Sequence, residues 1–277
     1  MTKHIMNIVY GIILGISNVI PGVSAGTMAV VLNIYDTLLD AISLKGEKLK
    51  KNFPFLITLG LGMGIGIILF SNAITFLFER YNMQTNFLFM GIIIGSIPMV
   101  INHAKKDNKI TKKNWIPFIL SLSIMIIMAL ADSAKDNTYL IREVNFGMNC
   151  WLIIAGMVSA FSMIIPGISG SFIMLTLGVY SSVVAAVSEF NLAILIPVAF
   201  GIVIGLIGGI KIVKILLMRY NQATYMAILG LVLGSVFVIY PGFTFNATGF
   251  FALIYMCIGI ISTYYFSNKW FEKIRIY

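Results

Sequence analysis

Long apolar runs dominate this chain and restrict what it can fold into. Ten of them occur, at about residues 5–20, 28–42, 53–78, 87–101, 115–131, 148–165, 172–187, 192–217, 225–240 and 250–266. Several reach the roughly 20 apolar residues that a helix needs to cross a bilayer, whereas the first two are not comfortable spans. Only 10% of the residues are charged, too few to cover a water-facing surface. The runs therefore predict an all-α, polytopic membrane protein.

The basic residues indicate which side of the membrane each loop faces. With a cytoplasmic N-terminus, all but three of the 19 Lys and Arg residues fall on the cytoplasmic side, the exceptions being Arg80, Lys135 and Arg142. Cytoplasmic loops of membrane proteins carry such an excess of positive charge. The distribution predicts that both termini are cytoplasmic. It also assigns the net charge of +9 to membrane orientation, and no nucleic-acid partner is expected.

The sequence contains an internal repeat. Residues 11–43 align without gaps on residues 156–188, and residues 52–101 align on residues 191–240. Polar and glycine positions carry much of the match, which composition alone does not explain. The matched pairs include Pro21/Pro166, Gly22/Gly167, Ser24/Ser169, Tyr35/Tyr180 and Arg80/Arg219.

The two repeats are predicted to be inverted. Repeat one covers about residues 5–102 and repeat two about residues 148–241, with a linker helix at about 115–131 between them and a final helix at about 250–266. Each repeat holds four segments, so the single helix between them turns the second repeat over. Inverted repeats with a midplane site are a ground plan of secondary transporters. We expect one integral membrane domain over residues 1–277, with about six full transmembrane helices.

Two similar loops interrupt the short segments that begin each repeat: P-G-V-S-A-G-T at residues 21–27 and P-G-I-S-G-S-F at residues 166–172. Proline ends a helix, glycine permits unusual backbone angles, and serine favours the start of the next helix. Irregular backbone at membrane depth must be buried in protein or line a cavity. The pattern predicts two re-entrant helical hairpins, one entering from each side, whose tips meet near the middle of the membrane.

Such tips are typical of a phosphate site, because free backbone N–H groups, hydroxyls and positive helix ends favour an anion. Arg80 and Arg219 are predicted on opposite faces, where they can contact a phosphate at each mouth or anchor the topology. The alternative for the loops is a simple helix break or close packing. The candidate loop residues are Asn18, Gly22, Ser24, Gly26, Thr27, Gly167, Ser169, Gly170 and Ser171.

Few carboxylates are available to couple transport to protons. Asp36 follows the first hairpin's Tyr35, and Glu189 follows the second hairpin, so these two are the proton-coupling candidates. A solvated helix end is the alternative role for each. His4 and His103 lie at lysine-bearing edges, where a place at the membrane interface is expected. With no cluster of carboxylates or histidines, neither a metal nor a cofactor is expected.

Glycines recur in two of the longer segments, at residues 60, 62, 64 and 66 and at residues 201, 205, 208 and 209. Neither set has the lysine or the strand that accompanies a nucleotide-binding loop. Small residues at such spacings let helices approach closely. These glycines therefore predict close helix packing.

With these two loops and the Tyr35 and Tyr180 that follow them, the chain resembles the polyprenyl-phosphate transporter family over nearly its whole length. The specific marks are P-G-V-S-x-G-T-M-A and P-G-I-S-G-S-F, with Ala25 where a glycine is usual. The resemblance implies that undecaprenyl phosphate, a polyprenyl phosphate lipid, is moved across the bacterial cytoplasmic membrane. This would recycle the lipid carrier for cell-envelope polymers such as peptidoglycan.

Two other functions share features of these loops. An undecaprenyl-pyrophosphate phosphatase also has inverted re-entrant repeats, but its chemistry needs acid–base or nucleophilic groups, and neither loop contains Arg, Glu or His. A carrier of a small anion differs only in whether its groove opens sideways to lipid. The sequence leaves open the coupling ion, the direction, the oligomeric state and the range of lipids accepted.

Overall fold

In this computed structural model the described residues are 2–19, 24–42, 46–105, 110–132, 141 and 145–274. Every regular element within these ranges is a helix, so the all-α prediction is confirmed. The elements are α1 (Thr2–Val19), α2 (Ala25–Val31), α3 (Tyr35–Ala41), α4 (Gly46–Arg80), α5 (Asn82–Ala104), the 3-10 helix η1 (Lys112–Asn114), α6 (Trp115–Asp132), α7 (Phe146–Ile164), α8 (Gly170–Thr176), α9 (Tyr180–Ser188), α10 (Leu192–Arg219), α11 (Asn221–Ile239) and α12 (Ala247–Ile274).

Seven of the described helices are long and apolar enough to cross a membrane: α4, α5, α6, α7, α10, α11 and α12. The sequence predicts about six, and the additional one is α7, which the sequence pattern places in the second hairpin. It starts at Phe146 because Asn145 caps it, accepting a hydrogen bond from the backbone N–H of Met148 at 2.8 Å. Its counterpart α1 contains only a shorter apolar stretch, His4–Asn18. The architecture is that of a multi-pass membrane protein.

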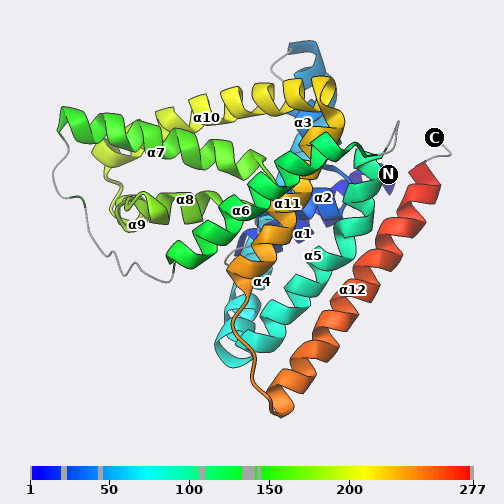
Figure 1. The fold of residues 1–277 in the computed structure, drawn as a ribbon. Coiled ribbons are helices and arrows are strands. Elements are labelled where there is room, and N and C mark those ends of the chain that lie inside the picture. The colour runs from blue at the N-terminus through cyan, green and yellow to red at the C-terminus, as the bar shows by residue number, and fades with distance from the viewer. Residues whose placement is uncertain are drawn as a thin grey trace.

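The same helix contacts recur in the two halves of the chain. α1 packs along α4, and α7 packs along α10; α5 packs against both α11 and α12, and α11 packs against both α5 and α6 (Figure 1). In the repeat alignment α1 corresponds to α7, α4 to α10 and α5 to α11. The two helices outside the repeats, α6 and α12, thus cover equivalent helices.

Equivalent helices α5 and α11 run antiparallel where they pack. The end of α5 meets the start of α11, where the rings of His103 and Tyr225 stack at 5.1 Å. The start of α5 lies at the far end of α11, where the rings of Phe87 and Tyr240 are 6.0 Å apart. An inverted repeat predicts this arrangement. The orientation of each half in a membrane stays a prediction.

Glycines allow the paired helices to approach closely. A Cβ on Gly62 or Gly66 of α4 would meet the backbone of α1, and a Cβ on Gly201 or Gly205 of α10 would meet the backbone of α7. The prediction of close helix packing is confirmed for these four. Not every glycine of the two sets lies at such a helix contact. Gly60, Gly64 and Gly208 face open space.

Each segment that follows a loop consists of two short helices, where the sequence predicted a single one at residues 28–42 and at residues 172–187. The breaks lie at Asn33 and Gly178, which have φ of 57° and 73°. At each break, the backbone N–H of the following residue, Ile34 or Val179, donates to the carbonyl oxygen five residues earlier, at 2.9 and 3.0 Å. This left-handed cap ends a helix, and Gly or Asn is its usual residue. The two positions are equivalent in the repeat, so the signal was present in the sequence.

Candidate functional site

The two loops that were predicted to converge are in contact. Thr27, in the first turn of α2, accepts a hydrogen bond on Oγ1 from the backbone N–H of Gly167 at 2.8 Å. Gly26 packs on the end of α7 and the start of the second loop, where an added Cβ would lie 3.1 Å from the carbonyl oxygen of Met163 and 3.5 Å from Pro166. Residues 140 positions apart are therefore joined through buried groups. The depth of this contact in a membrane stays a prediction.

Ser24 and Thr27 form a buried pair on the first loop. Ser24 caps α2, because its Oγ accepts from the backbone N–H of Thr27 at 3.1 Å, and its Oγ also lies 2.9 Å from Thr27 Oγ1. The two residues are 6% and 1% exposed. Their hydroxyls hold the first loop against the second in this conformation. A phosphate that binds here must therefore replace or join these hydrogen bonds.

The second loop turns at Gly167. Its φ is 97°, and an added Cβ would meet the backbone of Leu231. A side chain at this position would be both strained and blocked. Leu231 is the eleventh residue of the nineteen in α11, so the loop packs against the middle of a helix long enough to span a membrane.

Hydroxyls on the second loop are less buried than those on the first. Ser169 precedes α8, and its Oγ lies 2.8 Å from the Oγ of the exposed Ser171. The carbonyl of Gly170 accepts a hydrogen bond from Ser159 of α7 at 2.7 Å, which fixes the start of α8. The second loop thus offers a hydroxyl pair on a fixed backbone.

The remaining candidates from the sequence are Asn18, Gly22, Arg80 and Arg219. Asn18 is exposed near the end of α1, and Gly22 falls outside the described residues. Arg80 and Arg219 are exposed at the ends of α4 and α10. Arg219 ends α10, and Leu231 lies ten residues beyond the first residue of α11, about 15 Å along that helix. Because α5 and α11 are antiparallel, the two arginines lie at opposite ends of the molecule, not at the loops.

A polar cluster surrounds Asp36, and we call its four residues, Asn33, Asp36, His103 and Tyr225, the Asp36 cluster. The hydroxyl of Tyr225 lies 2.8 and 3.0 Å from the two carboxylate oxygens of Asp36 and donates to them. The Tyr225 ring stacks on His103, whose Nε2 is 2.8 Å from Oδ1 of Asn33. The sequence pointed to Asp36 but not to Tyr225 and His103, which come from chain positions far from it.

The second half does not repeat this cluster. Asp36 is equivalent to Ser181 and Tyr225 to Asn86 in the repeat alignment. The other proton-coupling candidate, Glu189, is the exposed residue that ends α9. Near the Asp36 cluster, Lys214 of α10 pairs with Asp40 of α3 at 2.7 Å. Among the described residues, no three His, Cys, Asp or Glu side chains gather as a metal site.

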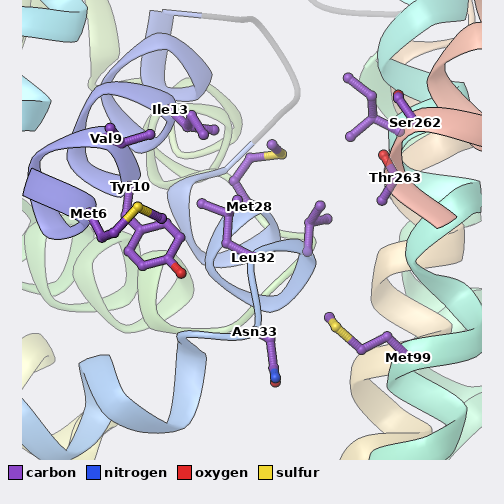
Figure 2. Close-up of a pocket in the computed structure, with 12 residues that line it drawn as sticks. Met6, Val9, Tyr10, Ile13, Met28, Leu32, Asn33, Met99, Ser262 and Thr263 are labelled. Carbon is purple, nitrogen blue, oxygen red and sulfur yellow. The ribbon is translucent and has the colours of Figure 1, made fainter. Parts of the chain in front are cut away.

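An apolar cavity of about 300 Å³ lies beside α2 (Figure 2). Met28 of α2 and Leu32, which directly follows α2, form one wall, and residues of α1, α5 and α12 form the others. Asn33 of the Asp36 cluster also lines it. No sequence pattern indicated this cavity, because four helices from distant parts of the chain enclose it.

Comparisons with known proteins agree with this architecture. A family model described as undecaprenyl phosphate translocase-like matches residues 14–251. A polyprenyl-phosphate transporter of Staphylococcus aureus is 33% identical over 264 residues, covering 92% of this chain and 93% of the relative. A polyprenyl-phosphate transporter of Vibrio cholerae is 32% identical over 247 residues, covering 83% and 76%. No solved structure matches the chain. The chain therefore belongs to the undecaprenyl phosphate translocase-like family, whose relatives named here are transporters.

Proposed function

We propose that this protein transports a polyprenyl phosphate, undecaprenyl phosphate above all, across the bacterial cytoplasmic membrane and so recycles the lipid carrier. Both termini are then cytoplasmic. The observation that carries the proposal is the buried contact between the two repeat loops at the middle of α11. It occurs in a chain whose relatives are named polyprenyl-phosphate transporters.

The physical problem in moving this lipid is its head group. An ionised phosphate in hydrocarbon costs tens of kcal/mol by Born estimates, so spontaneous crossing is negligible. The polyprenyl tail can stay in the lipid throughout. A carrier therefore has to shelter only the phosphate, and two loops that meet at the level of a helix midpoint suit that task.

The loops supply neutral donors to the phosphate in this proposal. Hydroxyls and backbone N–H groups bind a phosphate without the strong ion pair that a buried arginine forms. This suits a carrier, because the phosphate must leave on the other side. Arg80 and Arg219 then attract the head group at the two ends of the molecule. The proposed loop residues are Asn18, Gly22, Ser24, Gly26, Thr27, Gly167, Ser169, Gly170 and Ser171.

Proton coupling is a further part of this proposal. Inward movement of a negative charge against an inside-negative potential costs about 2.3 kcal/mol per charge per 100 mV, and a proton carried along offsets this cost. Asp36 is the better of the two candidates, because the Tyr225 hydroxyl contacts both of its carboxylate oxygens. Glu189 ends a helix and is exposed.

Leaflet exchange of undecaprenyl phosphate in liposomes tests the proposal. Ser24→Ala and Ser169→Ala should each lower lipid binding by roughly ten- to a hundredfold, since a hydrogen bond to a charged group contributes about 1.5–3 kcal/mol. Ser96→Ala is the matched control: Ser96 is fully buried, but its hydroxyl donates only to Ile93 of its own helix, at 2.7 Å. Exchange that is unaffected by both loop substitutions would overturn the site.

The same preparations distinguish transport from catalysis and test proton coupling. A transporter releases no inorganic phosphate from undecaprenyl pyrophosphate, whereas a phosphatase does, and that release would disappear with the serine substitutions.

With the outside made acidic, exchange by the native chain should accelerate. Asp36→Asn should abolish this acceleration and Glu189→Gln should retain it; the reverse result would reassign the proton carrier.

A further inference from the structure

The cavity beside α2 lies between two packed helix pairs. α1 packs along α4, and α12 packs along α5, while α2 contacts both α1 and α5. Within the described part of the chain, α1 forms no packed pair with α5 or α12. Figure 2 shows α1 on one side of the cavity and Met99, Ser262 and Thr263 on the other. The cavity can therefore open toward lipid without separating a packed pair.

The lining suits an apolar, irregular chain. Aliphatic and thioether groups predominate, and the methionines Met6, Met28 and Met99 come from three different helices. Methionine side chains are flexible and polarisable, so they adapt to irregular ligands. The cavity also has polar groups in its wall, among them the Tyr10 hydroxyl and the Asn33 amide, both labelled in Figure 2. An apolar volume with a few polar groups in its wall fits an amphiphile better than a free anion.

We propose that this cavity holds the isoprene units next to the phosphate of the transported lipid, an inference that rests on the proposed function. An apolar cavity of about 150 Å³ accommodates a benzene molecule, so one of about 300 Å³ has room for roughly two five-carbon units. Met28 follows Ser24 of the proposed phosphate site by one helical turn, about 6 Å along α2. A lipid with its phosphate at the loops thus reaches the cavity directly. The rest of its tail leaves between α1 and α12.

Filling the cavity tests this inference. Ser262→Trp places an indole in it, and Ile261→Trp is the matched control, because the neighbouring Ile261 is 66% exposed and does not line the cavity. Val9→Trp and Ile5→Trp form a second such pair on α1, in case the first variant fails to fold. Displacing only two methylene groups from an apolar site lowers affinity about tenfold. The cavity variants should therefore lower leaflet exchange tenfold or more, and the controls less than twofold.

Photo-cross-linking identifies the occupant. The probe is a polyprenyl phosphate that carries a diazirine on its second isoprene unit, in liposomes containing the full chain. We expect labelled peptides from α1, α2 and α12, loss of label in the cavity variants, and competition by undecaprenyl phosphate but not by phosphatidylglycerol. Equal competition by phosphatidylglycerol would show that ordinary acyl chains fill the cavity.

The outcomes separate this inference from the proposed function. Cavity variants that exchange lipid like their controls would overturn the tail site while leaving transport in place, provided that Ser24→Ala and Ser169→Ala still impair exchange. Absence of exchange in the native chain would instead overturn the proposed function. The cross-linking alone would then show whether a polyprenyl chain occupies the cavity.

Discussion

A hydroxyl group joins the two loops, and no charged side chain among their described residues takes part in the contact. Thr27 accepts from Gly167 across the contact, and Ser24 supports Thr27 from the same side. The sequence indicated these three residues, because each belongs to a local motif that recurs in both repeats. It did not indicate His103 and Tyr225 beside Asp36, because stacking between rings 122 residues apart leaves no local pattern.

Replacement of Thr27 by valine should loosen the loop contact. Valine keeps the shape but leaves the buried Gly167 N–H without its acceptor, which costs roughly 1–3 kcal/mol. Thermal unfolding of the purified protein in detergent should show a lower melting temperature for Thr27→Val. Thr27→Ser retains the acceptor and should recover most of the loss. Equal melting temperatures for the valine variant and the native chain would mean that this hydrogen bond does not hold the loops together.

The helices divide into those that the apolar pattern delimits well and those that it does not. The long segments from α4 to α12 were anticipated to within several residues, because an apolar run is a local property of the sequence. The two segments after the loops were not, because the break in each depends on the backbone conformation of a single residue. Asn33 and Gly178 adopt left-handed backbone there and redirect the chain.

A glycine comparison within α4 tests how tightly the paired helices pack. Gly62→Leu forces a side chain into the backbone of α1, so we expect little folded protein; overpacking alone typically costs about 1–3 kcal/mol, and backbone cannot yield easily. Gly64→Leu points into open space two residues away and should fold normally. Size-exclusion chromatography in detergent measures both. Similar elution of the two variants would contradict the assigned helix faces.

At the scale of the whole molecule, two halves with matching helix contacts pack through the antiparallel helices α5 and α11. The halves are not identical in chemistry, because Ser181 and Asn86 replace Asp36 and Tyr225. The Asp36 cluster, which includes His103 near the end of α5 and Tyr225 near the start of α11, lies at one end of this helix pair.

Reporter fusions test the inversion of the two halves. A reporter joined after Lys105, at the end of α5, should be cytoplasmic, and one joined after Asn145, before α7, should be external, because α6 is the one membrane-length helix that the structure describes between them. Compartment-specific enzyme reporters read the two positions directly. Location of both fusions on one side would remove the inverted repeat, and with it the argument for loops meeting at the midplane.

The sequence by itself determined the membrane class, the repeat and the two loop motifs, since each depends on apolar runs or on residues close together in the chain. Only the tertiary structure decided which groups meet. The Thr27–Gly167 bond, the Asp36 cluster and the cavity beside α2 join residues 70 to 189 positions apart or helices from both ends of the chain. Such contacts depend on how helices pack, and apolar helix surfaces permit many packings that only glycine contacts and side-chain shape distinguish.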